Sequence, residues 1–113
     1  MRKKITVVTM GQSPVDPQTH DVYRMLAQAC DVELRGILDG MSEAEAKMLA
    51  PEGGELFIVT SLRTGREVRL AERNAIRLVN ERLLEAEQSG SAAALVFCTG
   101  HFDIPEMRMP VFI

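Results

Sequence analysis

The sequence predicts a three-layer α/β fold in which a mostly parallel β-sheet is flanked by helices. Two segments, Ile5–Met10 and Ala93–Phe97, are almost wholly apolar, which is typical of strands buried on both faces of a parallel sheet. Helical patterns alternate with these and other strand patterns along the chain. A turn between two strand patterns adds a β-hairpin near Ser61–Leu70. The length of 113 residues fits one domain, spanning positions 1–113.

The first strand leads through a turn into a helix. The turn is Gly11–Pro14, and Asp16 followed by Pro17 provides a good N-cap and first helical residue. Apolar residues then recur at helical spacing and predict one buried stripe, formed by Val22, Met25, Leu26 and Ala29.

The next strand pattern is more polar, and a short helix follows it. From Val32 to Leu38 the first residues alternate between apolar and charged, which favours a strand at a sheet edge. Ser42–Glu45 has the capping-box pattern that begins a helix, and Pro51 and Gly53–Gly54 end it.

The second half of the chain contains the hairpin, a long helix and two more strands. Leu56–Leu62 and Glu67–Leu70 are strand patterns joined by a turn. An amphipathic helix is predicted from about 73 to 88, with the inward-facing residues Ile76, Val79 and Leu83. After the apolar strand Ala93–Phe97, the last strand pattern begins at Val111–Ile113.

Composition argues against several classes of protein. Apolar residues make up 46% of the chain, too many for a disordered segment. The formal net charge is -3 and the 13 basic residues are dispersed, so a nucleic-acid-binding face is not expected. No apolar run approaches the roughly 18 residues of a membrane span. The first ten residues resemble a signal peptide but lack a small-residue cleavage site, so we interpret them as a mature strand.

The two cysteines, Cys30 and Cys98, do not form a pair motif. Their number supports neither a zinc cage nor a disulfide framework, so we predict no metal site and expect a reducing, cytoplasmic setting. Gly11 is not part of a dinucleotide-binding glycine motif, and no cofactor is expected.

Two loops are predicted at the edge of the sheet where binding sites form. In parallel sheets, ligands bind beyond the carboxyl ends of the strands. The two most apolar strands deliver Gly11–Pro14 and Cys98–His101 to this edge. We expect both strands to be central in the sheet. If the two strands are adjacent, their loops lie side by side.

Four ordered motifs make the chain similar to the AroM family. They are the opening Ile5–Pro14, the pair Leu38–Ser42 and Ala50–Gly54, the hairpin segment Val59–Val68, and Val96–Phe102. The resemblance covers essentially the whole chain. Family members are typically about twice as long, so it implies the N-terminal half of an AroM-like protein. Val15 and His101 differ from the arginine and the acidic residue that many relatives have at these positions.

The AroM family in turn resembles the aspartate/glutamate racemase superfamily, which has two similar α/β halves. That resemblance implies cofactor-independent proton transfer at the Cα of a small carboxylate, with one cysteine from each half. Cys98 would be one acid/base, and a single cysteine cannot racemise by this route.

The residues around Cys98 in the sequence also make it the strongest catalytic candidate, independently of the family resemblance. A thiolate beside the free amides of a turn has a lowered pKa, and His101 could lower it further if the loop folds back. The alternative is that Cys98 is a small apolar residue packed at a strand end. Cys30 is expected to be packed against the core.

The remaining candidates are ligands for an anion. Gly11, Gln12 and Ser13 in one loop, with Thr99, Gly100 and His101 in the other, offer hydroxyls and backbone amides that suit a carboxylate or phosphate. Alternatively, Ser13 and Thr99 only satisfy the turn backbone. The arginines Arg63, Arg66 and Arg69 are either solvated or reach an anion or a partner subunit.

Two functional hypotheses follow. The chain is half of a racemase/isomerase-type enzyme, or it is a non-catalytic module that binds a small anion or dimerises. We expect a homodimer in either case, because an open strand at Val111–Ile113 would favour pairing with a second copy.

Overall fold

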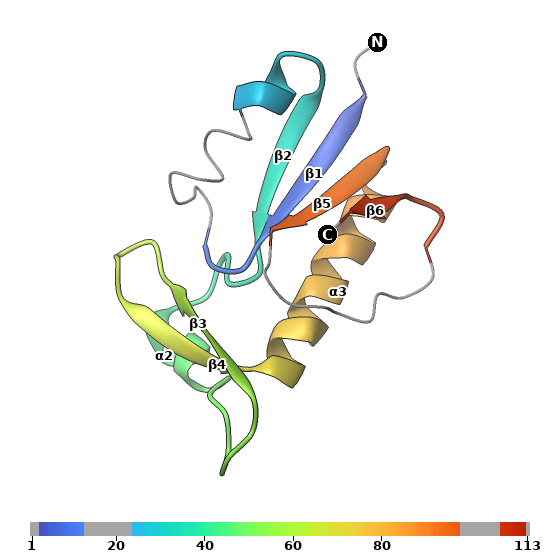
Figure 1. The fold of residues 1–113 in the computed structure, drawn as a ribbon. Helices are drawn as coiled ribbons and strands as arrows, with labels where there is room; N and C mark the ends of the chain where they lie inside the picture. Colours follow the sequence, from blue (N-terminus) through green and yellow to red (C-terminus); the bar gives the residue numbers. More distant parts are fainter. Residues whose placement is uncertain (1–2, 13–23, 98–106, 113) are drawn as a thin grey trace.

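The computed structural model describes residues 3–12, 24–97 and 107–112 (Figure 1). In this part of the chain a parallel sheet has the strand order β2-β1-β5-β6, and a separate antiparallel sheet pairs β3 with β4. The strands are β1 (Lys4–Thr9), β2 (Asp31–Gly36), β3 (Phe57–Ser61), β4 (Glu67–Ala71), β5 (Ala93–Phe97) and β6 (Val111–Phe112). The helices are α2 (Glu43–Lys47), α3 (Glu72–Gln88) and a helical turn at 24–27. The mixed α/β prediction is confirmed.

The two most apolar strands are adjacent at the centre of the sheet. β1 is buried on both faces, since Val7 and Val8 point to opposite sides and both are inaccessible. In β5 the residues Ala94 and Val96 are buried, whereas Leu95 on the other face is only half-buried. The predicted edge position of the alternating strand is also confirmed, because among the described strands β2 pairs only with β1.

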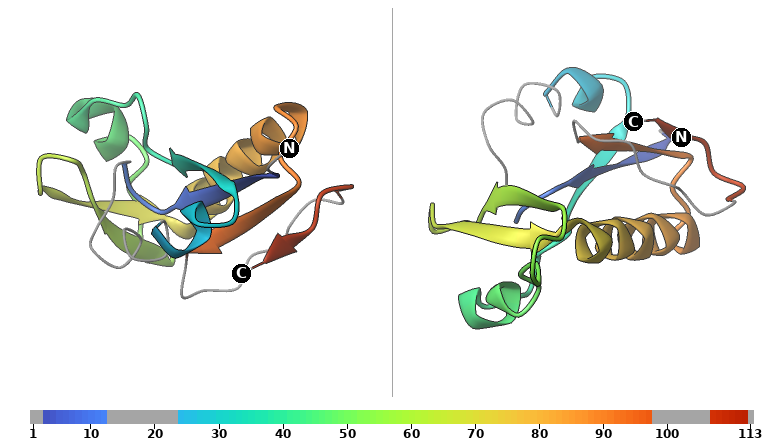
Figure 2. Two further views of the ribbon diagram at one scale, coloured as in Figure 1. Left: turned by 90° about the horizontal axis from the view of Figure 1, so that it is seen from above. Right: turned by 60° about the horizontal axis from the view of Figure 1, so that its bottom comes forward.

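Helix α3 covers one face of the parallel sheet. Its buried residues form the expected helical stripe and include Ala75, Leu78, Val79, Leu83 and Ala86. Val79 and Leu83 therefore face inward as predicted, and Ile76 is half-buried at the margin. The helical turn at 24–27 lies on the other side of the sheet (Figure 2). None of the helices in the described ranges has both the length and the apolar character needed to cross a bilayer.

The predicted stripe of the first helix is partly wrong. Met25 is 68% exposed and Ala29 is exposed, whereas Leu26 is half-buried. The amides of Ala29 and Cys30 both donate to the carbonyl of Leu26, at 3.0 and 2.9 Å, in a turn that ends the helix. Helical periodicity therefore stops before Ala29, because the chain must turn into β2. Val22 lies outside the described residues.

The capping box that begins α2 is confirmed. The Ser42 hydroxyl accepts from the Glu45 amide at 3.1 Å, and the Glu45 carboxylate accepts from the Ser42 amide at 3.0 Å. The hydrogen bond from the Ser42 backbone amide, with that of the Ser42 side chain, lowers the pKa of Glu45 despite slight desolvation.

The β3–β4 hairpin and α2 lie beyond the carboxyl end of β1 (Figure 1). The hairpin turn ends at Gly65, whose φ of 91° explains the glycine there. A single apolar cluster joins this unit to the parallel sheet, with Leu62, Val68 and Leu70 from the hairpin region packed in the same core as Val8 and Val96. The hairpin is thus fixed against the edge where the sequence predicts a site.

The opposite, amino-terminal end of the sheet is held by polar contacts. The hydroxyls of Thr6 and Ser91 form a buried hydrogen bond of 2.5 Å. On the same face of the sheet, Glu33 pairs with Lys4 at 3.1 Å and with Arg35. Burial raises the pKa of Glu33, but hydrogen bonds and positive charges from Arg35 and Lys4 outweigh it and lower the pKa overall.

Candidate functional site

Two of the seven predicted site residues lie within the described part of the chain. Gly11 and Gln12 follow β1 directly. The other five lie outside the described residues, namely Ser13, Cys98, Thr99, Gly100 and His101.

The strand register relates the two predicted loops. Thr9, the last residue of β1, is the parallel partner of Phe97, the last residue of β5. β1 and β5 therefore end at the same edge of the sheet, where Met10–Gln12 follow β1. That the loop from Cys98 onward shares this site stays a prediction, because it lies outside the described residues.

Gly11 permits a close approach of the hairpin to the end of β1. A Cβ atom at this position would lie 2.5 Å from the backbone oxygen of Ser61 and 3.1 Å from the Thr60 hydroxyl. The first distance is far below van der Waals contact, and the obstructing atom belongs to the backbone. The backbone carbonyl of Gly11 also accepts from the amide of Leu38 at 3.0 Å. Glycine is required here because any side chain would collide with the backbone of the hairpin.

The side chain of Gln12 connects three backbone segments at the same edge. Its amide nitrogen donates to the carbonyls of Leu38 at 3.1 Å and Met41 at 2.9 Å. Its amide oxygen accepts from the backbone amide of Arg63 at 2.8 Å. Both donor hydrogens are thus engaged, which gives Gln12 a positioning role and leaves it only a spare lone pair for a ligand.

The hydrogen bond to Gln12 brings a basic hairpin turn to the edge. Arg63 is the first residue of the turn, its side chain is 59% exposed, and its guanidinium lies 3.9 Å from the carboxylate of Asp39. Asp39 is itself ordered, because its carboxylate accepts from the Gly36 amide at 2.8 Å. Arg66, the residue directly after the turn, pairs with Glu43 at 3.4 Å. An exposed pair such as Arg66–Glu43 contributes only up to about 1 kcal/mol.

Thr9 contributes a buried hydroxyl at the end of β1. The residue is 3% exposed, and its hydroxyl oxygen has no hydrogen-bond partner within the described residues. A buried hydroxyl without a partner is unfavourable. It is therefore a candidate to interact with a ligand or with neighbouring chain at the edge.

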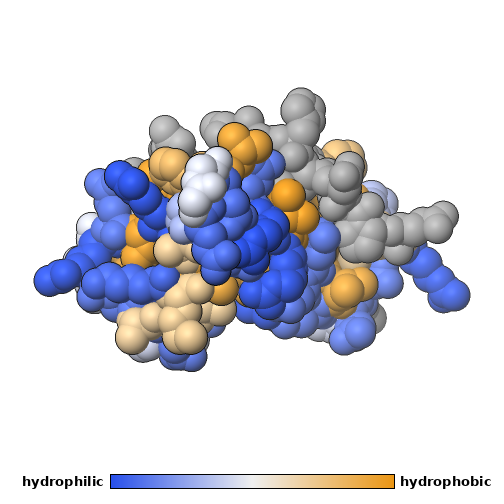
Figure 3. All heavy atoms as spheres, turned by 90° about the horizontal axis from the view of Figure 1, so that it is seen from below, coloured by the Kyte–Doolittle hydropathy of each residue, from blue (hydrophilic) through white to orange (hydrophobic). Residues whose placement is uncertain are grey.

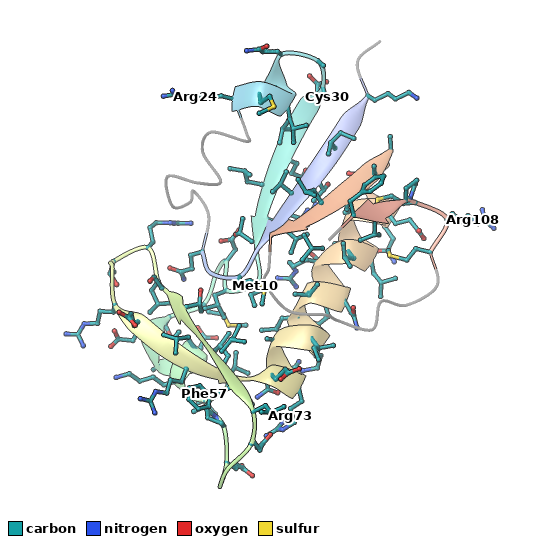
Figure 4. The ribbon with its side chains drawn as sticks, viewed as in Figure 1. Met10, Arg24, Cys30, Phe57, Arg73 and Arg108 are labelled. Carbon is teal, nitrogen blue, oxygen red and sulfur yellow. The ribbon has the colours of Figure 1, made fainter. Side chains whose placement is uncertain are left out.

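Cys30 lies at the opposite edge of the sheet from this site. It precedes Asp31, which pairs with Lys4 at the start of β1, whereas Phe97 pairs with Thr9 at its end. Five residues of extended chain separate these levels by about 16 Å. Figure 4 shows Cys30 and Met10 at opposite ends of the sheet. Cys30 is half-buried and lies far from the carboxyl edge of β1 and β5.

Sequence reasoning missed Asp39 and Thr9. Asp39 lies just beyond the alternating strand pattern, in a Leu-Asp-Gly-Met turn whose composition indicates a turn but no ligand. Thr9 sits inside a strand pattern, where a threonine is ordinarily a packing residue. Within the described ranges, no group of three or more histidine, cysteine or acidic residues is placed to hold a metal ion.

The described side chains at this edge are of kinds that can bind an anion. They are the exposed guanidinium of Arg63 and the buried hydroxyl of Thr9, beside the ends of two central parallel strands.

Comparisons with known proteins agree with the sequence motifs. The model of the family described as AroM protein matches residues 5–113. The searches of curated proteins and of solved structures found no match. The match extends from β1 through the hairpin and α3 to the last strand, and the chain therefore belongs to the AroM family.

Proposed function

We propose that the carboxyl edge of β1 and β5 binds a small carboxylate, and that Cys98 there acts as one acid/base of a racemase/isomerase-type reaction. The resemblance of AroM proteins to aspartate/glutamate racemases suggests the reaction. The observation that carries the binding site is the hydrogen bond from Arg63 to Gln12, which anchors the arginine-bearing turn at the end of β1.

Arg63 would bind the carboxylate. A guanidinium can present two parallel N–H donors to a carboxylate, and an α-amino acid would leave its ammonium group free to approach Asp39.

Cys98 would transfer the proton. As a thiolate it would remove the proton from the Cα of the bound substrate, leaving a neutral thiol and a carbanion whose charge is delocalised into the carboxylate. Return of a proton to the same face regenerates the substrate. Return to the other face requires a second acid, and Cys30 cannot supply it because it lies at the opposite edge. Inversion by this route would need a group from outside the described residues.

The second candidate is a non-catalytic anion-binding module. The geometry of Gln12 favours it, because the side chain organises the edge through backbone contacts and takes no part in proton transfer. The two candidates share the same ligand site and differ only in the chemistry of Cys98.

Titration with L-aspartate, followed by isothermal calorimetry, tests the binding. We expect saturable binding that weakens at least tenfold in Arg63→Gln, since a charged hydrogen-bonded group is lost. Arg77→Gln is a matched control, because Arg77 is a similarly exposed arginine on α3 with an acidic partner, Glu81. Absence of binding to aspartate, glutamate and succinate at millimolar concentrations would contradict the proposal.

Exchange of the Cα hydrogen in D₂O tests the reaction. A single acid/base is enough for exchange, so the wild-type chain should add one deuterium to bound aspartate, as measured by mass spectrometry. Cys98→Ser should bind aspartate normally and stop the exchange. Binding without exchange in the wild type would rule out the catalytic role and leave the anion-binding module.

A further inference from the structure

We propose that the carboxylate of Glu87 acts as a clamp that holds the segment 107–112 over the edge of β5, and that copies of the chain associate through β5 when this clamp opens. The segment includes β6, which covers β5 on the side away from β1. This part of the sheet is separate from the carboxylate site, to which neither Glu87 nor the segment contributes.

Glu87 lies in the last turn of α3 and binds two consecutive backbone amides. Its Oε2 atom accepts from the amide of Arg108 at 2.8 Å and from the amide of Met109 at 3.2 Å, 21 and 22 positions away in the sequence. Both amides precede β6, so they are not part of its ladder with β5. The carboxylate supplies the acceptor that they need, and hydrogen bonds to a charged group are stronger than those between neutral groups.

The sequence before β6 explains why the acceptor comes from outside the sheet. Pro110 has no amide hydrogen, so donation into the ladder cannot begin before Val111. The carbonyl of Pro110 accepts from the amide of Ala94 at 3.0 Å, and β6 then adds two residue pairs with β5. In the described part of the segment, backbone contact with the sheet therefore starts at Pro110, and Glu87 holds the residues before it.

Side-chain burial holds the segment at one main point. Met109 is 6% exposed and belongs to the core, whereas Phe112 on β6 is 60% exposed. Figure 4 shows Arg108 on the stretch of chain that leads into β6. With a single fully buried side chain as the other anchor, the two bonds to Glu87 are a substantial part of what keeps the segment closed.

Opening of the segment would turn a wholly apolar strand into an edge. The sequence of β5 is Ala-Ala-Leu-Val-Phe, without a charge, proline or glycine, whereas the edge strand β2 carries Glu33 and Arg35. Uncharged apolar strands at an edge pair readily with other chains, and charges prevent this. Figure 3 shows apolar groups scattered among hydrophilic ones on the face seen from below, unlike the unbroken apolar run of β5. A second copy of the chain is therefore the expected occupant of the opened edge.

Native-state hydrogen exchange of the Ala94 amide, measured by NMR, tests the clamp, because this amide is bonded to the segment. Glu87→Ala should lower its protection about tenfold or more, since the segment opens more often. The amide of Ile37 donates to Thr9 at 3.0 Å on the far side of β1 and should keep its protection. Glu87→Gln retains a side-chain oxygen acceptor and should restore the protection of Ala94 to within about threefold of wild type.

Glu81→Ala is the matched control, because it removes an acidic residue from the same helix without touching the segment. Glu81 pairs with Arg77 at 3.5 Å and with Arg82 at 3.7 Å. This variant should leave the protection of Ala94 unchanged.

Sedimentation velocity over a concentration series tests the role of β5. The weight-average mass of Glu87→Ala should rise more steeply with concentration than that of wild type or of Glu81→Ala. Leu95 is half-buried in the middle of β5, and Leu95→Lys places a charge on the opened strand. Adding it to Glu87→Ala should return the mass to that of wild type, while the protection of Ala94 stays low.

Unchanged protection of Ala94 in Glu87→Ala would overturn the clamp, because Met109 alone would then hold the segment. Equal losses of protection at Ala94 and Ile37 would also overturn it, since they indicate general destabilisation. Low protection of Ala94 without increased association, or association that persists in E87A/L95K, would overturn the role of the β5 edge.

Discussion

The side-chain oxygen of Gln12 accepts a hydrogen bond from the backbone amide of Arg63 at 2.8 Å, between residues 51 positions apart in the sequence. The same side chain donates to two carbonyls of the 38–41 turn. One amide group thus joins the end of β1, the turn after β2 and the hairpin turn. This contact determines where the arginine-bearing turn lies relative to the central strands.

Replacing Gln12 should destabilise the fold at this junction. Gln12→Ala removes three hydrogen bonds in a half-buried site, and we expect the free energy of unfolding to fall by about 2 kcal/mol. Urea denaturation measures it. Gln28→Ala is the matched control, since Gln28 is exposed in a turn and should change stability by less than about 0.5 kcal/mol. Equal effects of the two substitutions would show that the Gln12 contacts are energetically unimportant.

Gly11 should tolerate no side chain. In Gly11→Ala the new methyl group would meet the Ser61 carbonyl, a backbone atom that cannot rotate away, and stability should fall by at least about 2 kcal/mol. Gly54→Ala is a control, because a Cβ there meets nothing within 4 Å and the only cost is its φ of 78°. That cost is about 1 kcal/mol. A Gly11→Ala protein as stable as Gly54→Ala in the same urea titration would contradict the close approach of the hairpin.

The buried pair Thr6–Ser91 should behave as a coupled unit. Thr6→Val leaves the Ser91 hydroxyl without this partner and should cost about 1.5 kcal/mol, because a buried polar group loses its hydrogen bond. Thr6→Val with Ser91→Ala removes both groups and should be less destabilising than the sum of the single changes. A double-mutant cycle should give a coupling energy of about 1 kcal/mol. Strict additivity would mean that the two hydroxyls do not interact in solution.

The ion pairs of Glu33 predict a dependence of stability on acid pH. The folded-state pKa of Glu33 lies below its ordinary value, so its stabilising contribution is present above the unfolded-state pKa and is lost as the pH falls through the folded-state pKa. Glu33→Gln should therefore be less stable than wild type at pH 7, by less than about 1 kcal/mol because the pair is partly solvated. The difference should shrink as the pH falls through the folded-state pKa of Glu33 and disappear once the carboxyl group is protonated in both states. A difference that persists at pH 2, measured by chemical denaturation, would exclude the ion pairs as its cause.

Local patterns predicted most of the fold. The apolar runs of β1 and β5, the alternation that indicated β2 as an edge, the Ser42–Glu45 capping box and the amphipathic pattern of α3 all depend on neighbours within a few residues. The stripe at Met25 and Ala29 failed because the helix ends where the chain must enter β2, and periodicity alone does not specify where a helix stops. The strand pattern from Val32 to Leu38 likewise extends past the observed strand. β2 ends at Gly36, and the buried Ile37 and Leu38 follow it.

The candidate site was less predictable because its contacts are distant in the sequence. The apolar character of two strands was enough to place the ends of β1 and β5 at one edge of the sheet, with Gly11–Gln12 following β1. It could not reveal that the side chain of Gln12 forms hydrogen bonds with the backbone of two other turns, or that Gly11 packs against the backbone of Ser61. Such pairings depend on how the hairpin packs against the sheet, which no single segment encodes.

The alkylation rate of Cys98 relative to Cys30 tests the proposed site most directly. Iodoacetamide at neutral pH, followed by peptide mass spectrometry, measures both thiols in one sample. We predict that Cys98 reacts much faster than Cys30. The alkylation rate of Cys98 should rise with pH around a midpoint below roughly 8.5, the pKa of a free thiol. We also predict that aspartate slows Cys98 alone, and that this protection is lost in Arg63→Gln. Equal slow rates at the two cysteines, unaffected by aspartate, would show that Cys98 is a packed core residue and that the edge is not a carboxylate site.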